Sequence, residues 1–437
     1  MSLAYRTMRT ESETPAGVGA AARWLAALLD AADAVWRTHR GWVIAALLVA
    51  AVLQSRAALP KMGEFNIQYN AAVRTLSGEI PYRRTDHYYF TYPPAVLFLY
   101  APFTRLPLRA AKEAWCAVAV ALLAWNVVLS GRMTALRPSP GVLLVAALCT
   151  VRHLTNNLMR GQITPLIFVA ILLAWVFDAR DRPGRAGVAM AVAIHTKLYP
   201  GIAAILFVLR ARWRTVAATL AAVLALFVLP VVFFPLGTYP HVLAAWLDLA
   251  LGESAHGCFH KAMNQSIAAF FYRLLTADRN HVAIVHLPSA VPLVLTVATH
   301  VAAFATTAIL VRRAEAVVDA EARALARAAA ASMLLIYLAV AVPCSHKYNL
   351  LAEVPGYVTL LCAFRREPAG RVAAVVVGST LVSYVAALRP LGVVCADLWS
   401  AAIVFVGCAL VARDACRGPG TAAVYTPSTN APLADAQ

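Results

Sequence analysis

The sequence predicts an all-α polytopic membrane protein. Of its 437 residues, 61% are hydrophobic and only 14% are charged, and the mean hydropathy is +0.69. A soluble domain is about half apolar and about a quarter charged. So much apolar surface needs lipid around it, and a chain in lipid satisfies its backbone polar groups by forming helices. Composition therefore excludes a water-soluble enzyme, a disordered chain and a coiled coil.

Twelve apolar segments predict the membrane spans of one domain, residues 41–412. A polar segment, 1–40, precedes it on the cytoplasmic side, so the first span is a signal anchor rather than a cleaved signal peptide. A polar tail, 413–437, follows it and is expected to be disordered and cytoplasmic. The spans are 41–59, 113–130, 141–152, 163–177, 186–196, 198–209, 215–235, 289–311, 329–343, 348–363, 372–388 and 393–412.

The distribution of arginines orients these spans. The 38 Lys and Arg outnumber the 21 Asp and Glu, a net charge of +17. With the N-terminus inside, the short inner loops 131–140, 178–185, 210–214, 312–328 and 364–371 hold 15 arginines in 48 residues. Such loops are typical of the cytoplasmic side. The basic charge therefore indicates topology; the chain has no DNA-binding motif or basic-aromatic patch, so we expect no nucleic-acid partner.

Short apolar segments have a separate interpretation. Residues 93–106 are too few to span straight, so we expect a re-entrant segment or the start of a kinked second span. Segments 186–196 and 198–209 are also short and lie between arginine-rich flanks. They predict a hairpin whose apex, with Lys197, stops near the outer leaflet. A lysine there is costly unless it meets an anion or water.

Two long outer loops remain, 60–92 and 236–288. In the first, apolar residues at helical spacing predict an amphipathic helix over 65–76 that lies in the membrane interface. Glu64 precedes this helix, where a carboxylate is favoured by the helix dipole. It is a candidate catalytic base, and the alternative is that it only caps the helix.

Two further polar segments are candidate binding sites at the outer surface. Between 152 and 162, two arginines accompany amide side chains, which suits a phosphate or a sugar and is also compatible with membrane anchoring. Near the tenth span, His346, Asn349 and Glu353 are spaced to share one helix face beside Lys347 and Tyr348. Polar stripes of this kind face a bundle interior or a cavity.

Other chemistry has less support. The cluster His256, Cys258 and His260 lacks a four-ligand pattern, so no metal site is expected. The cysteines form no CxxC pair, and most read as small buried hydrophobes. Glycine-rich nucleotide motifs, a Walker A sequence and a GxSxG elbow are absent from the sequence, which gives Rossmann enzymes, P-loop ATPases and α/β-hydrolases no support.

The order and spacing of several short motifs across residues ~60–365 resemble glycosyltransferase family 87, the polyprenyl-phosphate-mannose-dependent α-mannosyltransferases of the GT-C class. The first-loop pattern is Glu64, Phe65, Tyr69, Ala71-Ala72, Gly78, Tyr82 and Tyr92-Pro93-Pro94. The later motifs are Gly161-Gln162, Lys197-Leu198-Tyr199-Pro200, Arg212-Trp213-Arg214, Asn264-Gln265-Ser266 and Pro343-Cys344-Ser345-His346. In that family the first-loop acid is usually Asp, and a tryptophan usually follows the Pro-x-Ser stretch; this chain has Glu64 and lacks that tryptophan.

The resemblance implies a GT-C-like bundle of about twelve transmembrane helices with amphipathic interfacial helices in the first outer loop. It also implies transfer of a sugar, expected to be mannose, from a polyprenyl-phosphate donor to a lipid or glycan acceptor at the outer face of the cell membrane, by a single inverting displacement. No cofactor or metal is implied. The expected catalytic residues are Glu64 and His346. The expected substrate-binding residues are Lys197, Arg152, Arg160, Asn156, Gln162, Tyr92, Asn264, Gln265, Lys347 and Tyr348.

Two alternatives stay open. A flippase or transporter of lipid-linked sugars would distribute charges along a path through the membrane. A ligase or polymerase of lipid-linked oligosaccharides would be expected to carry paired arginines in its large outer loop. The sequence leaves the acceptor, the sugar, the polyprenol length and the oligomeric state undetermined.

Overall fold

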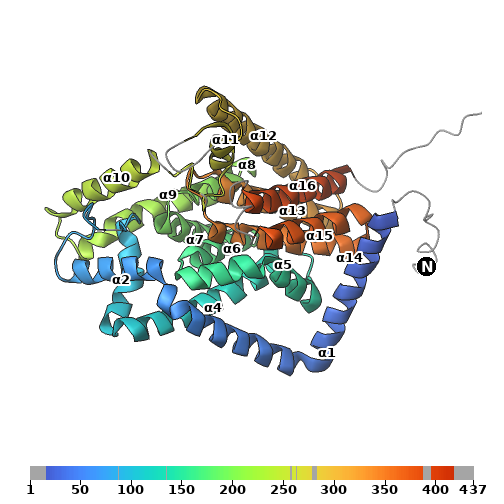
Figure 1. Cartoon of the computed structure of the whole chain (residues 1–437), viewed down its shortest axis with the longest axis horizontal. Coiled ribbons are helices and arrows are strands. Elements are labelled where there is room, and N and C mark those ends of the chain that lie inside the picture. Colours follow the sequence, from blue (N-terminus) through green and yellow to red (C-terminus); the bar gives the residue numbers. More distant parts are fainter. Residues whose placement is uncertain are drawn as a thin grey trace, which may run out of the picture.

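The computed structural model describes residues 16–86, 88–133, 135–255, 258–261, 263–277, 283–386 and 395–417, and its regular elements in these ranges are helices (Figure 1). The α-helices are α1 Ala16–Ala58, α2 Gly63–Leu76, α3 Leu97–Tyr100, α4 Leu108–Met133, α5 Pro140–Arg160, α6 Thr164–Ala179, α7 Pro183–Thr196, α8 Gly201–Leu209, α9 Trp213–Val228, α10 Tyr239–Ala255, α11 Ile267–Leu275, α12 Ala290–Glu315, α13 Ala320–Ala341, α14 Glu353–Arg366, α15 Gly370–Val385 and α16 Ala396–Arg417. The 3₁₀ turns are η1 Leu59–Lys61, η2 Pro94–Val96, η3 Ala101–Arg105, η4 Leu229–Val232 and η5 Lys347–Ala352.

Each of the twelve predicted segments corresponds to one helix, but the helices differ in length. In the described residues, seven helices are long and apolar enough to cross a membrane, and α6 and α15 are shorter apolar helices. Helices α7 and α14 have 14 residues and α8 has nine. At about 1.5 Å per residue, 14 residues reach about 21 Å, less than a hydrocarbon core of about 30 Å. The all-α membrane fold is confirmed, with several helices too short to span it straight.

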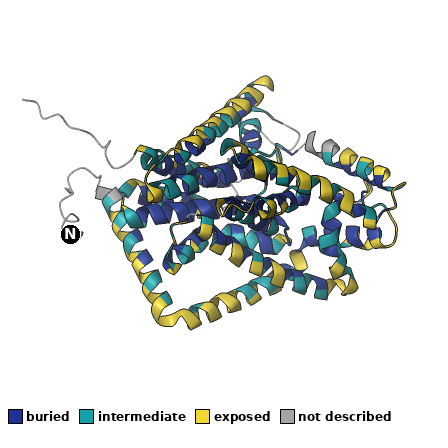
Figure 2. Ribbon diagram, turned by 180° about the vertical axis from the view of Figure 1, so that it is seen from behind, coloured by how far each residue is buried: buried dark blue, intermediate teal, exposed yellow. Residues whose placement is uncertain are grey.

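Burial separates a core from a lipid-facing periphery (Figure 2). Helix α14 is buried from Glu353 to Phe364, and α6 and α13 are buried along most of their length. On the outside, large apolar side chains are exposed on α1, α9 and α12, for example Leu48, Leu224 and Val294. Exposed apolar bands of this size mark a surface covered by lipid in a multi-pass membrane protein.

Helix α1 begins inside the segment expected to be a polar cytoplasmic extension. It bends at His39, where the backbone is not helical, and Figure 1 shows the two arms at a wide angle. The first arm is tied to the bundle because Asp33 accepts hydrogen bonds from Arg365 (2.8 Å) and from the backbone N–H of Gly141 (2.7 Å). The described part of 1–40 therefore packs on the bundle. Of the predicted disordered tail, residues 418–437 lie outside the described residues.

The segment 93–106 forms η2, α3 and η3, and Leu106 is extended before α4 begins. It is a run of short turns rather than the start of the α4 helix. The predicted hairpin consists of α7 and α8 with Lys197 in the turn between them.

The long helices give the bundle two ends. Helices α5, α7 and α13 finish at the end where α6 and α8 begin. At this end Gly161 packs on Phe65 of α2, and Tyr348 follows α13. Helix α2 and the 92–96 segment lie there too, on the left of Figure 1.

Candidate active site

Helix α2 places Glu64 at the entrance to the bundle. The amphipathic helix predicted over 65–76 is confirmed, with Phe65, Gln68 and Ala72 on its buried face. Phe65 lies among aromatic rings, including those of Tyr100 and Trp115, whose centroids are 5.8 Å and 5.7 Å away. This packing fixes the first turn, so the half-buried Glu64 carboxylate has a defined position.

Four side chains distant in sequence meet in what we call the Lys197 cluster, made of Glu64, Tyr92, Lys197 and Tyr348. The Lys197 Nζ atom lies 5.1 Å from the ring centroid of Tyr92 and 5.4 Å from that of Tyr348. The Tyr92 hydroxyl lies 3.5 Å from Glu64 Oε2. A carboxylate and an ammonium group therefore share one aromatic-lined site.

The electrostatics of this cluster favour an anionic ligand. Burial lowers the pKa of the Lys197 ammonium from its ordinary value, and the Glu64 carboxylate opposes this by raising that pKa. The two aromatic faces also stabilise the cation by cation–π attraction. A phosphate placed beside Lys197 would supply the full counter-charge that the aromatic rings supply only in part.

Residue 161 brings a third helix to the cluster. Gly161 ends α5 in the left-handed region, with φ of 66°. A Cβ atom there would lie 2.9 Å from Phe65 Cβ, so only glycine permits this approach of α5 to α2. The turn holds the buried Gln162 amide beside the Tyr348 hydroxyl, and the Gln68 amide is buried with no hydrogen-bond partner in the described residues. Such amides suit sugar hydroxyls. Gln68 was missed in the sequence, although it lies one turn after Glu64.

Asn264 joins two loops at the cluster and has a structural role. Its Nδ2 donates to the carbonyl oxygens of Pro343 (2.7 Å) and Cys258 (3.1 Å), and its Oδ1 accepts from the N–H of Ser345 (2.9 Å). The N–H of Gln265 donates to the Ser345 carbonyl at 2.6 Å.

A disulfide between Cys258 and Cys344 closes the same junction, a pairing that the sequence did not predict. Asn264 therefore orients the segment before His346. Of the cluster His256, Cys258 and His260, where no metal site was expected, His256 lies outside the described residues.

The polar stripe predicted on one helix face is divided by η5. Because 347–352 form a 3₁₀ turn, His346, Asn349 and Glu353 point to different surroundings. His346 lies near Lys197 and Arg160, and the positive charges of both lower the pKa of its imidazole. The Asn349 amide oxygen lies 3.5 Å from the Tyr199 hydroxyl, and Glu353 accepts from Ser400 at 3.0 Å. Of the three, His346 contacts the Lys197 cluster directly, with its ring centroid 5.2 Å from that of Tyr348.

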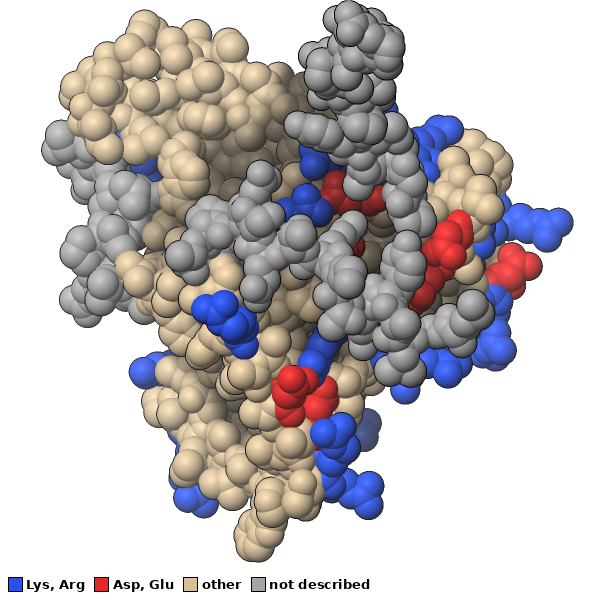
Figure 3. Space-filling view, turned by 90° about the vertical axis from the view of Figure 1, so that its right-hand side faces the viewer, with Lys and Arg blue, Asp and Glu red and all other residues tan. Residues whose placement is uncertain are grey.

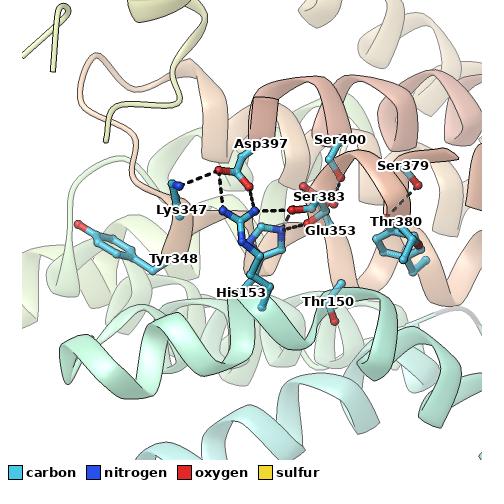
Figure 4. Close-up of polar contacts among 12 residues, drawn as sticks. Thr150, His153, Lys347, Tyr348, Glu353, Ser379, Thr380, Ser383, Asp397 and Ser400 are labelled. Carbon is cyan, nitrogen blue, oxygen red and sulfur yellow. Dashed lines mark hydrogen bonds and ion pairs between the residues drawn. The ribbon is translucent and has the colours of Figure 1, made fainter. Parts of the chain in front are cut away.

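Arg152 and Lys347 share one carboxylate partner, Asp397, and Figure 4 shows the Lys347 and Asp397 side chains facing each other. Both pair with Asp397: Lys347 Nζ lies 3.4 Å from its Oδ2, and the Arg152 guanidinium donates to both of its oxygens. Figure 4 shows the Tyr348 ring pointing away from this group. Arg152 and Lys347 are therefore partners of a buried carboxylate. The sequence analysis did not anticipate this, because Asp397 is distant from both residues along the chain.

We expect Asp397→Asn to destabilise the protein strongly. Asp397 is 2% exposed, so its loss leaves Arg152 and Lys347 without a counter-ion. Breaking a buried pair in this way costs about 3–5 kcal/mol, which thermal unfolding in detergent would detect. The matched control is Asp248→Asn, which breaks a solvent-exposed pair with Arg84 and should leave the unfolding temperature close to that of the wild type. Equal unfolding temperatures for Asp397→Asn and the wild type would contradict this assignment.

The remaining predicted residues lie near the end of α5. Arg160 is exposed, lies 3.7 Å from the Met263 sulfur and contributes positive charge at His346. Asn156 lies one turn before it, is half-buried and makes no side-chain hydrogen bond with the described residues. Asn157, by contrast, donates to the Tyr348 carbonyl at 2.9 Å and so supports the position of the Tyr348 ring.

His346 is neutral in the ligand-free protein at pH 7. Burial, and then the charges of Lys197, Arg160 and Lys261, lower its pKa to about 4. An unfolded histidine has a pKa of about 6.5, so the folded state binds fewer protons between these values and stability falls as the pH drops from about 6.5 to about 4.

The variant His346→Gln should therefore show a smaller loss of unfolding temperature between pH 7 and pH 5 than the wild type. The exposed His241, changed to Gln, provides the control and should keep the wild-type difference. The prediction fails if all three proteins lose the same number of degrees.

The model of glycosyltransferase family 87 matches residues 90–343. The solved structure of ArnT from Cupriavidus metallidurans bound to undecaprenyl phosphate is similar, with 15% identity, coverage of 87% of this chain and 78% of that chain, and a TM-score of 0.42. No curated protein matches the sequence. Because the family match covers more than half of the chain and includes Tyr92, Lys197 and Asn264, the chain belongs to glycosyltransferase family 87 and is a membrane glycosyltransferase.

Proposed function

We propose that the protein transfers a sugar, mannose, from a polyprenyl-phosphate donor to a glycolipid or glycan acceptor at the extracytoplasmic face of the cell membrane. The observation that carries this proposal is the Lys197 cluster. In it the Lys197 ammonium lies 5.1 Å from the ring centroid of Tyr92, and the Glu64 carboxylate lies 3.5 Å from the Tyr92 hydroxyl. Membership of glycosyltransferase family 87 supports the class of reaction, and a cation at the end of a helix bundle in lipid suits the phosphate of a lipid-linked donor.

In the proposed reaction, Lys197 binds the donor phosphate, with Arg160 adding positive charge at the entrance. An acceptor hydroxyl attacks the anomeric carbon, the bond from that carbon to the phosphate oxygen breaks, and Glu64 takes the hydroxyl proton. The products are the glycosylated acceptor with inverted anomeric configuration and the polyprenyl phosphate. Lys197 stabilises the charge that develops on the leaving phosphate.

His346, neutral and next to Lys197, is proposed to donate a hydrogen bond to the phosphate. Gln162 and Gln68 are proposed to bind sugar hydroxyls, because both amides are buried and the Gln68 amide lacks a partner among the described residues. Tyr92 and Tyr348 each present a ring face to the Lys197 ammonium and so help to position it. Lys347, Arg152 and Asn264 support this site from outside it.

The test is incubation of the purified protein with radiolabelled polyprenyl-phosphate mannose and a membrane lipid extract. The proposal expects a new labelled lipid or glycan and release of polyprenyl phosphate. Polyprenyl-phosphate glucose, run in parallel, reports the sugar specificity. Movement of labelled donor across proteoliposome membranes without formation of a labelled acceptor would instead favour a flippase.

The disulfide provides a test of the face on which the site lies. Disulfides persist in oxidising compartments and are rare in the cytoplasm, and Cys258–Cys344 adjoins His346. In intact spheroplasts, a membrane-impermeant reductant followed by an impermeant maleimide polymer should add two labels per chain. A Cys258→Ser/Cys344→Ser variant should add none. Labelling of the wild type only after lysis would place the site on the cytoplasmic side.

A further inference from the structure

A cavity of about 780 Å³ lies at the end of the bundle opposite the Lys197 cluster. It is lined by the last turns of α4, α6, α8 and α12 and by the first half of α13. Leu143, in the first turn of α5, lines the cavity, whereas Arg160, in its last turn, lies at the candidate active site. The 21 residues of α5 extend about 30 Å, so the cavity is a separate site.

Arginines dominate the charged lining of this cavity. The six are Arg132, Arg137, Arg180, Arg210, Arg323 and Arg327, and the one carboxylate in the lining is Glu315. Glu315 is already bound, because Arg210 Nε donates to its Oε1 at 2.8 Å and Arg327 donates to its Oε2.

The other four arginines of the lining are available to a ligand. Within the ranges that the structure describes, Arg132, Arg137, Arg180 and Arg323 form no ion pair with a carboxylate. They come from three separate segments, 131–140, 178–185 and 312–328, and converge on one hollow. Positive charges held around a concave site attract an anion more strongly than the same charges spread over a convex surface.

The floor of the cavity is apolar. Trp175, Leu206 and Val311 line it below the arginines. A small inorganic anion would leave this floor uncovered, whereas an amphiphile would place its acyl or prenyl carbons there and its head group among the guanidinium groups. Arginine forks match phosphate oxygens in pairs, and basic pockets between membrane helices bind anionic lipid head groups.

We propose that this cavity binds the anionic phosphate head group of a membrane lipid in the leaflet at that end of the protein. Figure 3 views the molecule from this end and shows Lys and Arg side chains distributed over it. The topological rule for cytoplasmic loops requires positive charge on this side, but it does not require that charge to converge on an amphipathic hollow. The test therefore has to separate total charge from position.

The experiment compares two triple variants with the same net charge. Arg132→Gln/Arg180→Gln/Arg323→Gln removes cavity arginines, and Arg214→Gln/Arg312→Gln/Arg313→Gln removes arginines that do not line the cavity. Each protein is titrated with phosphatidylglycerol in detergent, and bound lipid is counted by native mass spectrometry. We expect at least a tenfold weaker Kd for the cavity variant and an unchanged Kd for the control.

Two further arms identify the source of the phosphate. Inorganic phosphate at millimolar concentration should fail to displace the lipid; complete displacement would show a free-anion site and overturn the lipid assignment. Polyprenyl phosphate is titrated in the Lys197→Met background, in which the proposed active site binds this lipid more weakly. If polyprenyl phosphate binds this variant and the binding depends on the cavity arginines, the lipid is assigned as polyprenyl phosphate. If only phosphatidylglycerol binds in a way that depends on these arginines, the lipid is assigned as a phospholipid.

Two results would overturn the proposal. One is an equal loss of phosphatidylglycerol binding in both triple variants, which would show that total charge alone attracts the lipid. The other is wild-type binding by the cavity variant. Sugar transfer is measured in the same preparations, and retained transfer in the cavity variant keeps this proposal distinct from the proposed function.

Discussion

Glu64→Gln should lower the turnover number for sugar transfer by about 10²–10⁴-fold, the usual contribution of a general base. The amide keeps the shape of the side chain and its place beside Tyr92 but cannot accept the acceptor proton. The first turn of α2 is held by Phe65 and its aromatic neighbours, so the variant should fold and bind donor normally. The measurement is the kcat and the donor KM of purified enzyme in detergent.

Two matched variants sharpen this test. Glu64→Asp keeps the carboxylate but withdraws it by one methylene, so it should lose less activity than Glu64→Gln. Glu79→Gln changes an exposed acid of the same outer loop that pairs with Arg83, and it should keep the wild-type rate. Wild-type turnover by Glu64→Gln would remove this carboxylate from the mechanism and reduce it to a helix cap.

Lys197→Met should weaken binding of polyprenyl phosphate by roughly 10–150-fold. A charge-assisted hydrogen bond contributes about 1.5–3 kcal/mol, and each 1.4 kcal/mol corresponds to about a tenfold change in Kd. Methionine keeps an unbranched apolar stem between the rings of Tyr92 and Tyr348, so the change mainly removes charge. The Kd is measured by thermophoresis of labelled protein in detergent.

The control is Lys61→Met, an exposed lysine of η1 that precedes α2 at the same end of the bundle. It removes the same charge without touching the Lys197 cluster and should leave the Kd unchanged. If Lys197→Met and the wild type bind polyprenyl phosphate equally, the phosphate lies elsewhere and the proposed geometry of donor binding is wrong.

Local sequence was sufficient to predict the helices and one part of the site. The apolar runs were long enough to predict α4, α12 and α16, and the spacing of Phe65, Tyr69 and Leu76 predicted α2. The lysine between two short apolar segments indicated a functional residue, and the structure places Lys197 beside Tyr92 and Tyr348. These features depend on the periodicity and composition of adjacent residues, which a single sequence contains.

The sequence by itself determined the class of protein and its membrane environment. It also showed at which ends of the helices the arginines accumulate. The tertiary structure alone decided which cations are available to a ligand. Arg152 and Asp397 are 245 residues apart, and Cys258 and Cys344 are 86 apart, yet each pair is in contact. Helix formation follows from neighbours within a few residues, whereas the partner of a buried charge depends on how distant helices pack.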